Sequence, residues 1–179
     1  MTNESNENKI QPLEEKDIDR VCNIWLIGSL TSHWFIPAGF WYSLLPDTKK
    51  HLENSFSKNR GKEHYEGYVY KEKDGTIKGF VTVQCTNARG MTKNYMEELF
   101  VDLPYQRKGT DTEKGIGTQL LEHVKKNKTF LETSVYQLNT GAIIFYAKQG
   151  FEVKKGQDGI YVENKTGQWK LWMRWEEKE

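Results

Sequence analysis

A turn containing glycines lies between a strand-like and a helix-like stretch, in "VDLPYQRKGTDTEKGIGTQLLEHV", residues 101–124. The preceding "MEELFVD" reads as a strand, and the apolar residues after the turn share one face of a helix. Glycines just before a helix let an anion reach its unpaired N–H groups, where the helix dipole attracts negative charge. The turn therefore predicts a phosphate site at Gly109, Gly115 and Gly117. The alternative is a glycine-rich surface loop that only caps the helix.

Two familiar phosphate motifs do not fit this turn. A nucleotide-triphosphate loop ends in Gly-Lys-Ser/Thr, whereas here Lys114 precedes Gly115 and Ile116 follows it. A dinucleotide fingerprint needs a third glycine where Leu120 stands. The sequence therefore disfavours a nucleotide triphosphatase and a dinucleotide-dependent enzyme.

The rest of the chain alternates between helical and strand periods. Residues 17–30 are apolar at helical spacing, and an aromatic-rich segment and a second helical stretch follow. Residues 65–85 read as a hairpin around Asp74-Gly75. After the glycine turn come the strand "TSVYQL", the helix "TGAIIFYAKQ", the strand "FEVKK" and a hairpin-like return. The pattern predicts a mixed α/β layer fold with one central sheet.

Composition limits the classes of protein and partner. A chain of 179 residues suits one domain, expected over residues 9–176 after a flexible start at 1–8. The formal net charge of +1 offers no field that would select nucleic acid. No apolar stretch approaches the length of a membrane span, and no signal peptide is visible, so we expect a cytoplasmic protein. Whether it is a monomer or a homodimer stays open.

Only two cysteines occur, Cys22 and Cys85, each in an apolar-leaning stretch. This usage fits buried thiols in a reducing compartment better than a disulfide framework. Neither cysteine stands near a plausible histidine and carboxylate, and no His/Cys/Asp group has the spacing of a metal site. We therefore expect no covalent enzyme intermediate and no metal.

A second motif, "NTGAIIFYAKQGF", begins about 22 positions after Gly117. Asn139 suits the N-cap of the helix that follows. Ala142 and Tyr146 fall four residues apart on one face of that helix. Gly150 can take the left-handed conformation that ends a helix. The motif predicts a helix that presents Tyr146 beside a small residue, unless Tyr146 is simply a core aromatic.

Together the two motifs resemble the GCN5-related N-acetyltransferase (GNAT) family. Without residues 110–115 the turn would read "QRKGIGTQLL", which resembles the family's Gln/Arg-x-x-Gly-x-Gly pyrophosphate turn. The second motif matches the family pattern Asn-x-x-Ala-x-x-Phe-Tyr-x-x-x-Gly-Phe at every position. The aromatic segment and the closing "WKLWMRW" resemble the small bacterial YiaC-type acetyltransferases, associated with protein lysine acetylation. The extra residues 110–115 depart from the family and displace the basic pair Arg107 and Lys108.

The resemblance implies the fold and the cofactor. The fold would be a GNAT-like α/β (α+β) arrangement: one mixed central sheet, mostly antiparallel, with a parallel splayed strand pair and helices on both faces. The cofactor would be acetyl-CoA, with its pantetheine along the main chain of the strand before the turn. The implied cofactor-binding residues are Leu99, Phe100, Val101, Arg107, Lys108, Gly109, Gly115, Gly117, Thr118 and Asn139.

The resemblance also implies the chemistry. An amine would attack the acetyl thioester directly, and Tyr146 would reprotonate the departing thiolate. The amine must first lose a proton, for which Glu97 and Glu98 are candidates; strand alternation predicts that only one faces the acceptor, and Glu98 is preferred. A solvated edge carboxylate is the alternative. Candidate acceptor-binding residues, which could also be core packing, are His33, Trp34, Phe35 and Trp41.

The acceptor is expected to be a protein lysine, on the resemblance alone. Two alternatives stay open from the residues themselves. An aromatic-rich cleft without a dense acidic patch could also receive a small-molecule amine. The split glycine turn is compatible with a non-catalytic acyl-CoA-binding module, which an intact Tyr146 helix disfavours.

Overall fold

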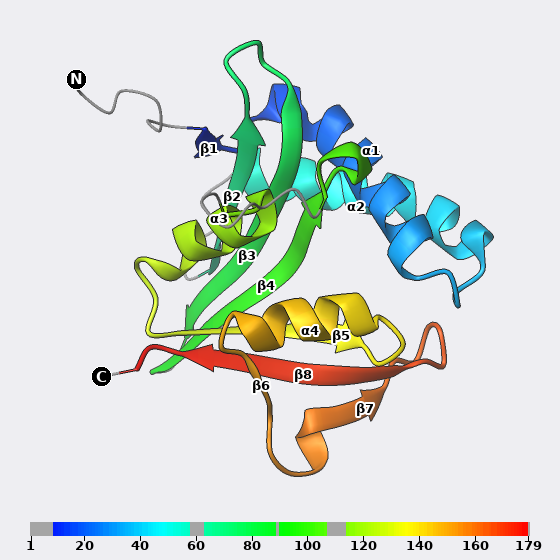
Figure 1. Cartoon of the computed structure of the whole chain (residues 1–179), viewed down its shortest axis with the longest axis vertical. Helices are drawn as coiled ribbons and strands as arrows, with labels where there is room; N and C mark the ends of the chain where they lie inside the picture. Colours follow the sequence, from blue (N-terminus) through cyan, green and yellow to red (C-terminus); the bar gives the residue numbers. More distant parts are fainter. Residues whose placement is uncertain (1–8, 58–62, 89, 107–113, 179) are drawn as a thin grey trace.

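The structure, a computed structural model, describes residues 9–57, 63–88, 90–106 and 114–178. One mixed sheet carries helices on both faces, as the sequence predicted (Figure 1). The strands are β1 (Ile10–Pro12), β2 (Glu63–Lys71), β3 (Ile77–Ala88), β4 (Met91–Val101), β5 (Phe130–Tyr136), β6 (Glu152–Val153), β7 (Ile160–Val162) and β8 (Trp169–Glu176). The α-helices are α1 (Ile18–Ser32), α2 (Ala38–Ser57), α3 (Ile116–Lys125) and α4 (Thr140–Lys148).

The strand order is β1-β2-β3-β4-β5-β8-β6, and β7 pairs with β8. Every pairing is antiparallel except that of β4 with β5, which is parallel and held by one residue pair, Tyr95 with Glu132. Beyond that pair the two strands run apart, which Figure 1 shows as a widening gap between β4 and β5. The Thr133 hydroxyl donates to the Met96 carbonyl (3.0 Å) at the narrow end of the gap. The expected splayed parallel pair is confirmed.

Local signals in the sequence produced the elements that flank this gap. The Asp74 carboxylate accepts the Thr76 N–H (2.9 Å) and Gly75 has φ 86°, so the predicted β2–β3 turn forms where only glycine is unstrained. The Asn139 side chain accepts the Ala142 N–H (3.2 Å) as the predicted N-cap of α4. Gly150 has φ 84° and ends that helix, also as predicted.

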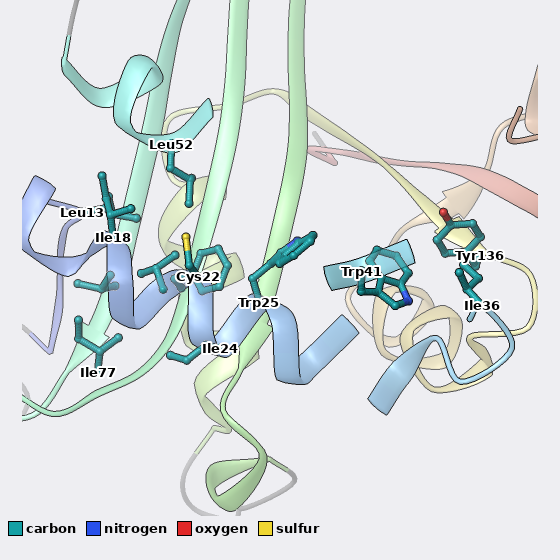
Figure 2. Packing of buried hydrophobic residues seen from close by; sticks show 13 residues of the cluster. Leu13, Ile18, Cys22, Ile24, Trp25, Ile36, Trp41, Leu52, Ile77 and Tyr136 are labelled. Atoms are coloured by element: carbon teal, nitrogen blue, oxygen red, sulfur yellow. The ribbon is translucent and has the colours of Figure 1, made fainter. Parts of the chain in front are cut away.

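Two apolar cores lie on opposite faces of the sheet. One core packs α1 and α2 against the sheet and includes Phe80 of β3; Figure 2 shows its side chains along α1, with Trp41 and Tyr136 at one end. The other packs α3 and α4 and includes Val81 of β3, because adjacent strand residues face opposite ways. Cys22 lies in the first core and Cys85 in the second, both as buried free thiols, as expected.

A β-bulge in β4 changes which face its side chains take. Thr82 pairs with Glu98 and Val83 with Met96, so Glu97 is the extra residue. Met96 packs in the α3 core, whereas Glu98 accepts a hydrogen bond from α1. Regular alternation would have put Met96 and Glu98 on one face. The bulge therefore delivers Glu98 to the α1/α2 face.

Two further expectations concern the N-terminus and the membrane. The expected flexible start at residues 1–8 lies outside the described residues. In the part of the chain that the structure describes, no helix has both the length and the apolar character needed to cross a membrane.

Candidate active site

A cavity of about 1140 Å³ runs from the start of α3, through the gap between β4 and β5, to α1 and α2. Pockets for one drug-sized ligand typically have roughly 300–1,000 Å³. The volume therefore has room for a large cofactor and part of a second reactant. The sequence-predicted residues that line it come from four places. They are Glu98, Leu99, Phe100 and Val101 of β4; Gly115, Gly117 and Thr118 at the start of α3; Asn139 and Tyr146 at the cap and on the body of α4; and His33, Trp34 and Trp41.

The first turn of α3 opens into one end of the cavity, here called the cofactor end, which is lined by residues 115–118. Gly115 is the N-cap and has no side chain to cap the helix, and the first helical bond runs from the Gln119 N–H to the Gly115 carbonyl (3.1 Å). The N–H groups of residues 116–118 precede that bond and so have no acceptor within the helix. Three predicted residues of this turn, Arg107, Lys108 and Gly109, lie outside the described residues.

Space at Gly117 is limited by α4 and β4. A Cβ added there would stand 3.5 Å from the Phe145 ring and 3.6 Å from the Val101 side chain. Those are ordinary contacts, so one methyl group fits and a larger side chain must fill the cleft. The Thr118 hydroxyl accepts a hydrogen bond from the side-chain amide of Gln149, the C-cap residue of α4 (3.2 Å).

Main-chain groups of β4 face the gap alternately. The Asp102 N–H donates to the Lys78 carbonyl (2.8 Å), which makes Lys78 and Asp102 a hydrogen-bonded pair. In an antiparallel ladder such pairs alternate, so the Phe100 main chain faces β3 and those of Leu99 and Val101 face the gap. The Val101 carbonyl accepts from the Gln106 amide (2.8 Å). This register leaves Leu99 and the Val101 N–H as the main-chain groups available to a ligand; Phe100 contributes its ring.

Tyr146 of α4 lines the cavity. It is 8% exposed, and Ala142 and Phe145 line the cavity beside it. Burial, and then the nearby Glu98 carboxylate, raise the pKa of Tyr146 well above its usual range. The phenol therefore keeps its proton at neutral pH and can act as a proton donor.

Glu98 lies at the α1/α2 end of the cavity, here called the acceptor end, together with Glu97 and His51. Its carboxylate accepts the indole N–H of Trp25 from α1 (3.1 Å). Burial raises the pKa of Glu98 to about 7, with a further rise from Glu97, while the Trp25 hydrogen bond opposes the shift. A carboxylate with a pKa near neutrality can take up a proton and release it again.

Glu97 also faces the cavity, which corrects the expectation that only one of the two carboxylates would. Its side chain pairs with His51 of α2 (3.0 Å), and both residues line the cavity. The hydrogen bond to Glu97 raises the pKa of His51. The bulge at Glu97 breaks the alternation on which the expectation rested.

The predicted aromatic residues divide into two groups. His33 and Trp41 stack with ring centroids 5.0 Å apart, and both line the cavity, as does the 75% exposed Trp34. Phe35 does not line it; its ring packs against Tyr136 (5.7 Å) and the neighbouring side chains. The aromatic segment thus supplies cavity wall and packing together.

His33 is placed as a structural rather than a basic group. Burial, and then the charge of Lys170, lower the pKa of His33 to about 4. The Asn139 amide lies 3.4 Å from its Nε2 atom. A neutral imidazole of such low basicity is a poor base for an ammonium group.

Sequence reasoning missed several residues of the acceptor end. Trp25 falls among the apolar positions of the helix predicted over residues 17–30, and that pattern gives no sign that its indole N–H donates to Glu98. His51 and Lys170 carried no signal, since each is a polar residue in an amphipathic element. Lys170 lines the cavity over the Tyr136 ring (4.5 Å), and burial lowers the pKa of Lys170.

Comparisons with known proteins agree with this geometry. Residues 63–153 match the family model described as an acetyltransferase (GNAT) domain. The chain is 27% identical over 145 residues to the peptidyl-lysine N-acetyltransferase YiaC of Escherichia coli (strain K12), covering 80% of this chain and 83% of that protein.

Two solved structures share the fold. The PaiA N-acetyltransferase of Thermoplasma acidophilum, in complex with coenzyme A, has a TM-score of 0.69 at 19% identity, covering 94% of this chain and 98% of that one. The apo form of YjaB from Escherichia coli has a TM-score of 0.68 at 20% identity, covering 93% and 95%.

The chain belongs to the GNAT acetyltransferase family, and it is an acetyl-CoA-dependent N-acetyltransferase. Its own residues fit the cofactor. The open N–H groups at the start of α3 can donate hydrogen bonds to a pyrophosphate, and the cavity connects them with Tyr146 and Glu98.

Proposed function

We propose that this enzyme acetylates lysine side chains of proteins or peptides. The observation that carries the proposal is Glu98: a carboxylate with a pKa of about 7, held by Trp25 inside an aromatic-walled cavity. A lysine side chain has an apolar stem, which suits Trp25 and Trp41, and an ammonium group, which suits Glu97 and Glu98. The similarity to a peptidyl-lysine acetyltransferase supports the same acceptor class.

On this proposal the cofactor is held mainly by main chain. The N–H groups of residues 116–118 would bind its pyrophosphate, and Gly115 and Gly117 would permit the approach. Leu99 and Val101 would bond the pantetheine arm from the strand gap. By the family resemblance we also assign Arg107, Lys108, Gly109, Thr118 and Asn139 to the cofactor side, and residues 9–176 to a single catalytic domain.

Acetyl-CoA, when bound, supplies the acetyl thioester. The Glu98 carboxylate accepts a proton from the lysine ammonium, which frees the nitrogen lone pair for attack. Tyr146 packs in the α3/α4 core, whereas Glu98 is bonded to α1. Tyr146 holds a proton at Oη and is the group available to protonate the leaving sulfur. His51 pairs with Glu97 (3.0 Å), which raises the pKa of His51 and favours the protonated imidazole that would offset the charge of Glu97.

Two exposed apolar residues that line the cavity favour an extended substrate. Trp34 and Leu138 both line the cavity, and their exposed fractions are 75% and 51%. Exposed apolar side chains at the rim can contact residues that flank a lysine in a peptide. A small free amine would leave both side chains in water.

The test is a thiol-release assay with acetyl-CoA and three acceptor sets: peptides with an internal lysine and a blocked N-terminus, peptides with a free N-terminus and no lysine, and free polyamines and aryl amines. We expect the highest kcat/KM for internal-lysine peptides, with the modified lysine located by mass spectrometry. Higher kcat/KM for a free amine would favour a small-molecule acetyltransferase. Acetyl-CoA binding by calorimetry without transfer to any set would favour a non-catalytic binding module.

A further inference from the structure

A cluster of possible metal ligands lies on the sheet face opposite α1 and α2, away from the catalytic cavity. His64 of β2 pairs directly with Cys85 of β3, and Glu66 follows two residues along β2, so the three side chains share one face. Their donor atoms lie within 4.8 Å of one another. The sequence spacing gave no such cluster, because the hairpin register alone brings position 85 beside 64 and 66.

The two ligand separations that involve Glu66 suit a tetrahedrally coordinated cation. Glu66 Oε1 is 3.4 Å from His64 Nε2 and 3.5 Å from Cys85 Sγ. Zinc bonds of roughly 2.0–2.3 Å at tetrahedral angles hold ligand atoms about 3.3–3.6 Å apart. We propose that His64, Glu66 and Cys85 form a binding site for Zn²⁺, each through one atom.

The donor set selects the kind of metal. Sulfur and imidazole nitrogen favour zinc-like ions over Mg²⁺ or Ca²⁺, which take oxygen ligands. The three residues also line a cavity of about 220 Å³, shared with Asn94 and Lys128, in which a water molecule can complete the coordination. The site would therefore be an open one, with three protein ligands.

Binding exchanges a proton for the metal at sulfur. Burial, together with Glu66, raises the pKa of Cys85 to about 12, so the thiol carries its proton before a cation arrives. Zn²⁺ binds cysteine as the thiolate, so the Sγ–H bond breaks, the Zn–S bond forms and the proton passes to solvent. No oxidant or reductant takes part.

Lys128 sets an upper limit on the affinity. Its ammonium bonds Glu66 Oε2 (2.6 Å), which leaves Oε1 directed at His64 and Cys85. A hydrogen bond of this kind orients a ligating carboxylate. The same positive charge repels a cation beside it, so removal of the charge should tighten binding.

Isothermal titration calorimetry of the reduced full-length chain with Zn²⁺ tests the proposal. We expect one ion per chain. Cys85→Ser and His64→Ala should each weaken Zn²⁺ binding more than about 100-fold, which exceeds the loss expected when a residue that only hydrogen-bonds to a metal ligand is removed. His64 is exposed, so His64→Ala tests the site without disturbing the core. Cys22→Ser is the matched control, because Cys22 is an equally buried thiol outside the cluster. Absence of Zn²⁺ binding to the wild type, or its retention in both ligand variants, would overturn the site.

Two further measurements identify the ligands. Co²⁺ in place of Zn²⁺ should give a thiolate-to-metal absorption that Cys85→Ser abolishes and Cys22→Ser keeps; the reverse result would refute Cys85 as a ligand. Lys128→Met, which keeps the side-chain volume, should tighten Zn²⁺ binding several-fold. Weaker binding in that variant would mean that the orientation of Glu66 by Lys128 outweighs the charge repulsion, and would refute the affinity limit assigned to Lys128.

Discussion

The two ends of the catalytic cavity are built from different chemical groups. At the start of α3 the groups that face the cavity are main-chain N–H donors beside glycine, and their chemistry is the same in any sequence that forms the turn. At the α1/α2 end they are the side chains of Glu97, Glu98 and His51. The pKa values of Glu98 and His51 depend on burial and on the charged groups beside them. The cofactor end should therefore be sensitive to shape, and the acceptor end to charge.

The largest effect is expected at Glu98. Glu98→Gln keeps an oxygen that can accept the Trp25 indole N–H but removes the base, so kcat/KM for a lysine peptide should fall about 10²–10⁴-fold near neutral pH. The Kd for acetyl-CoA, measured by calorimetry, should not change. A variant with the wild-type rate would move the base elsewhere and weaken the contrast between the two ends.

Tyr146→Phe comes next. Removal of the phenol proton should lower kcat by about 100-fold with little change in acetyl-CoA affinity, since a general acid acts in the chemical step. Tyr95→Phe is a matched control, because Tyr95 is another cavity-lining tyrosine whose hydroxyl is bonded to Ser134 (2.7 Å). Steady-state kinetics of both variants is the measurement. Equal losses of kcat in the two variants would mean that tyrosine packing matters rather than the Tyr146 proton.

At the cofactor end, Gly117→Val should raise the Kd for acetyl-CoA about tenfold, or ~1.4 kcal/mol. The branched side chain must occupy the cleft between Phe145 and Val101, where a single methyl group makes only ordinary contacts. Gly117→Ala is the graded control and should lose much less affinity by calorimetry. Unchanged binding in Gly117→Val would remove this glycine from the pyrophosphate site.

The smallest effect is a shift in a pH profile. Because Glu98 must be deprotonated to act as a base, kcat should rise with pH through about 7. The Trp25 indole stabilises the charged carboxylate and so lowers the pKa of Glu98; Trp25→Phe should move the midpoint upward by about one unit. A midpoint that stays in place, or moves to lower pH, would show that Glu98 does not set the profile.

Features governed by neighbours in sequence were predictable. The α4 cap at Asn139, its end at Gly150 and the turn at Asp74-Gly75 each depend on a few adjacent residues, and all formed as expected. The fold class was predictable too, because the helical and strand periods alternate along the chain. Of the predicted acceptor residues, Phe35 does not reach the cavity, since helical and loop geometry, not residue type, decides which aromatic faces it.

Features governed by the pairing of distant strands were not predictable. Nothing in "MEELFVD" marks Glu97 as the bulged residue; the bulge appears only in the register of β4 against β3. The same holds for the contact of Trp25 with Glu98, 73 residues apart, and for the His64–Glu66–Cys85 cluster.

The sequence by itself determined the order and kind of elements, the glycine turn before α3 and a helix that carries Tyr146, because these follow from periodicity and local backbone preference. Only the tertiary structure decided the facing of Glu98, its pKa near neutrality and the partners of His51 and His33. The physical reason is that a pKa depends on desolvation and on the charges around a group, and both arise only when α1, α2 and the sheet pack together.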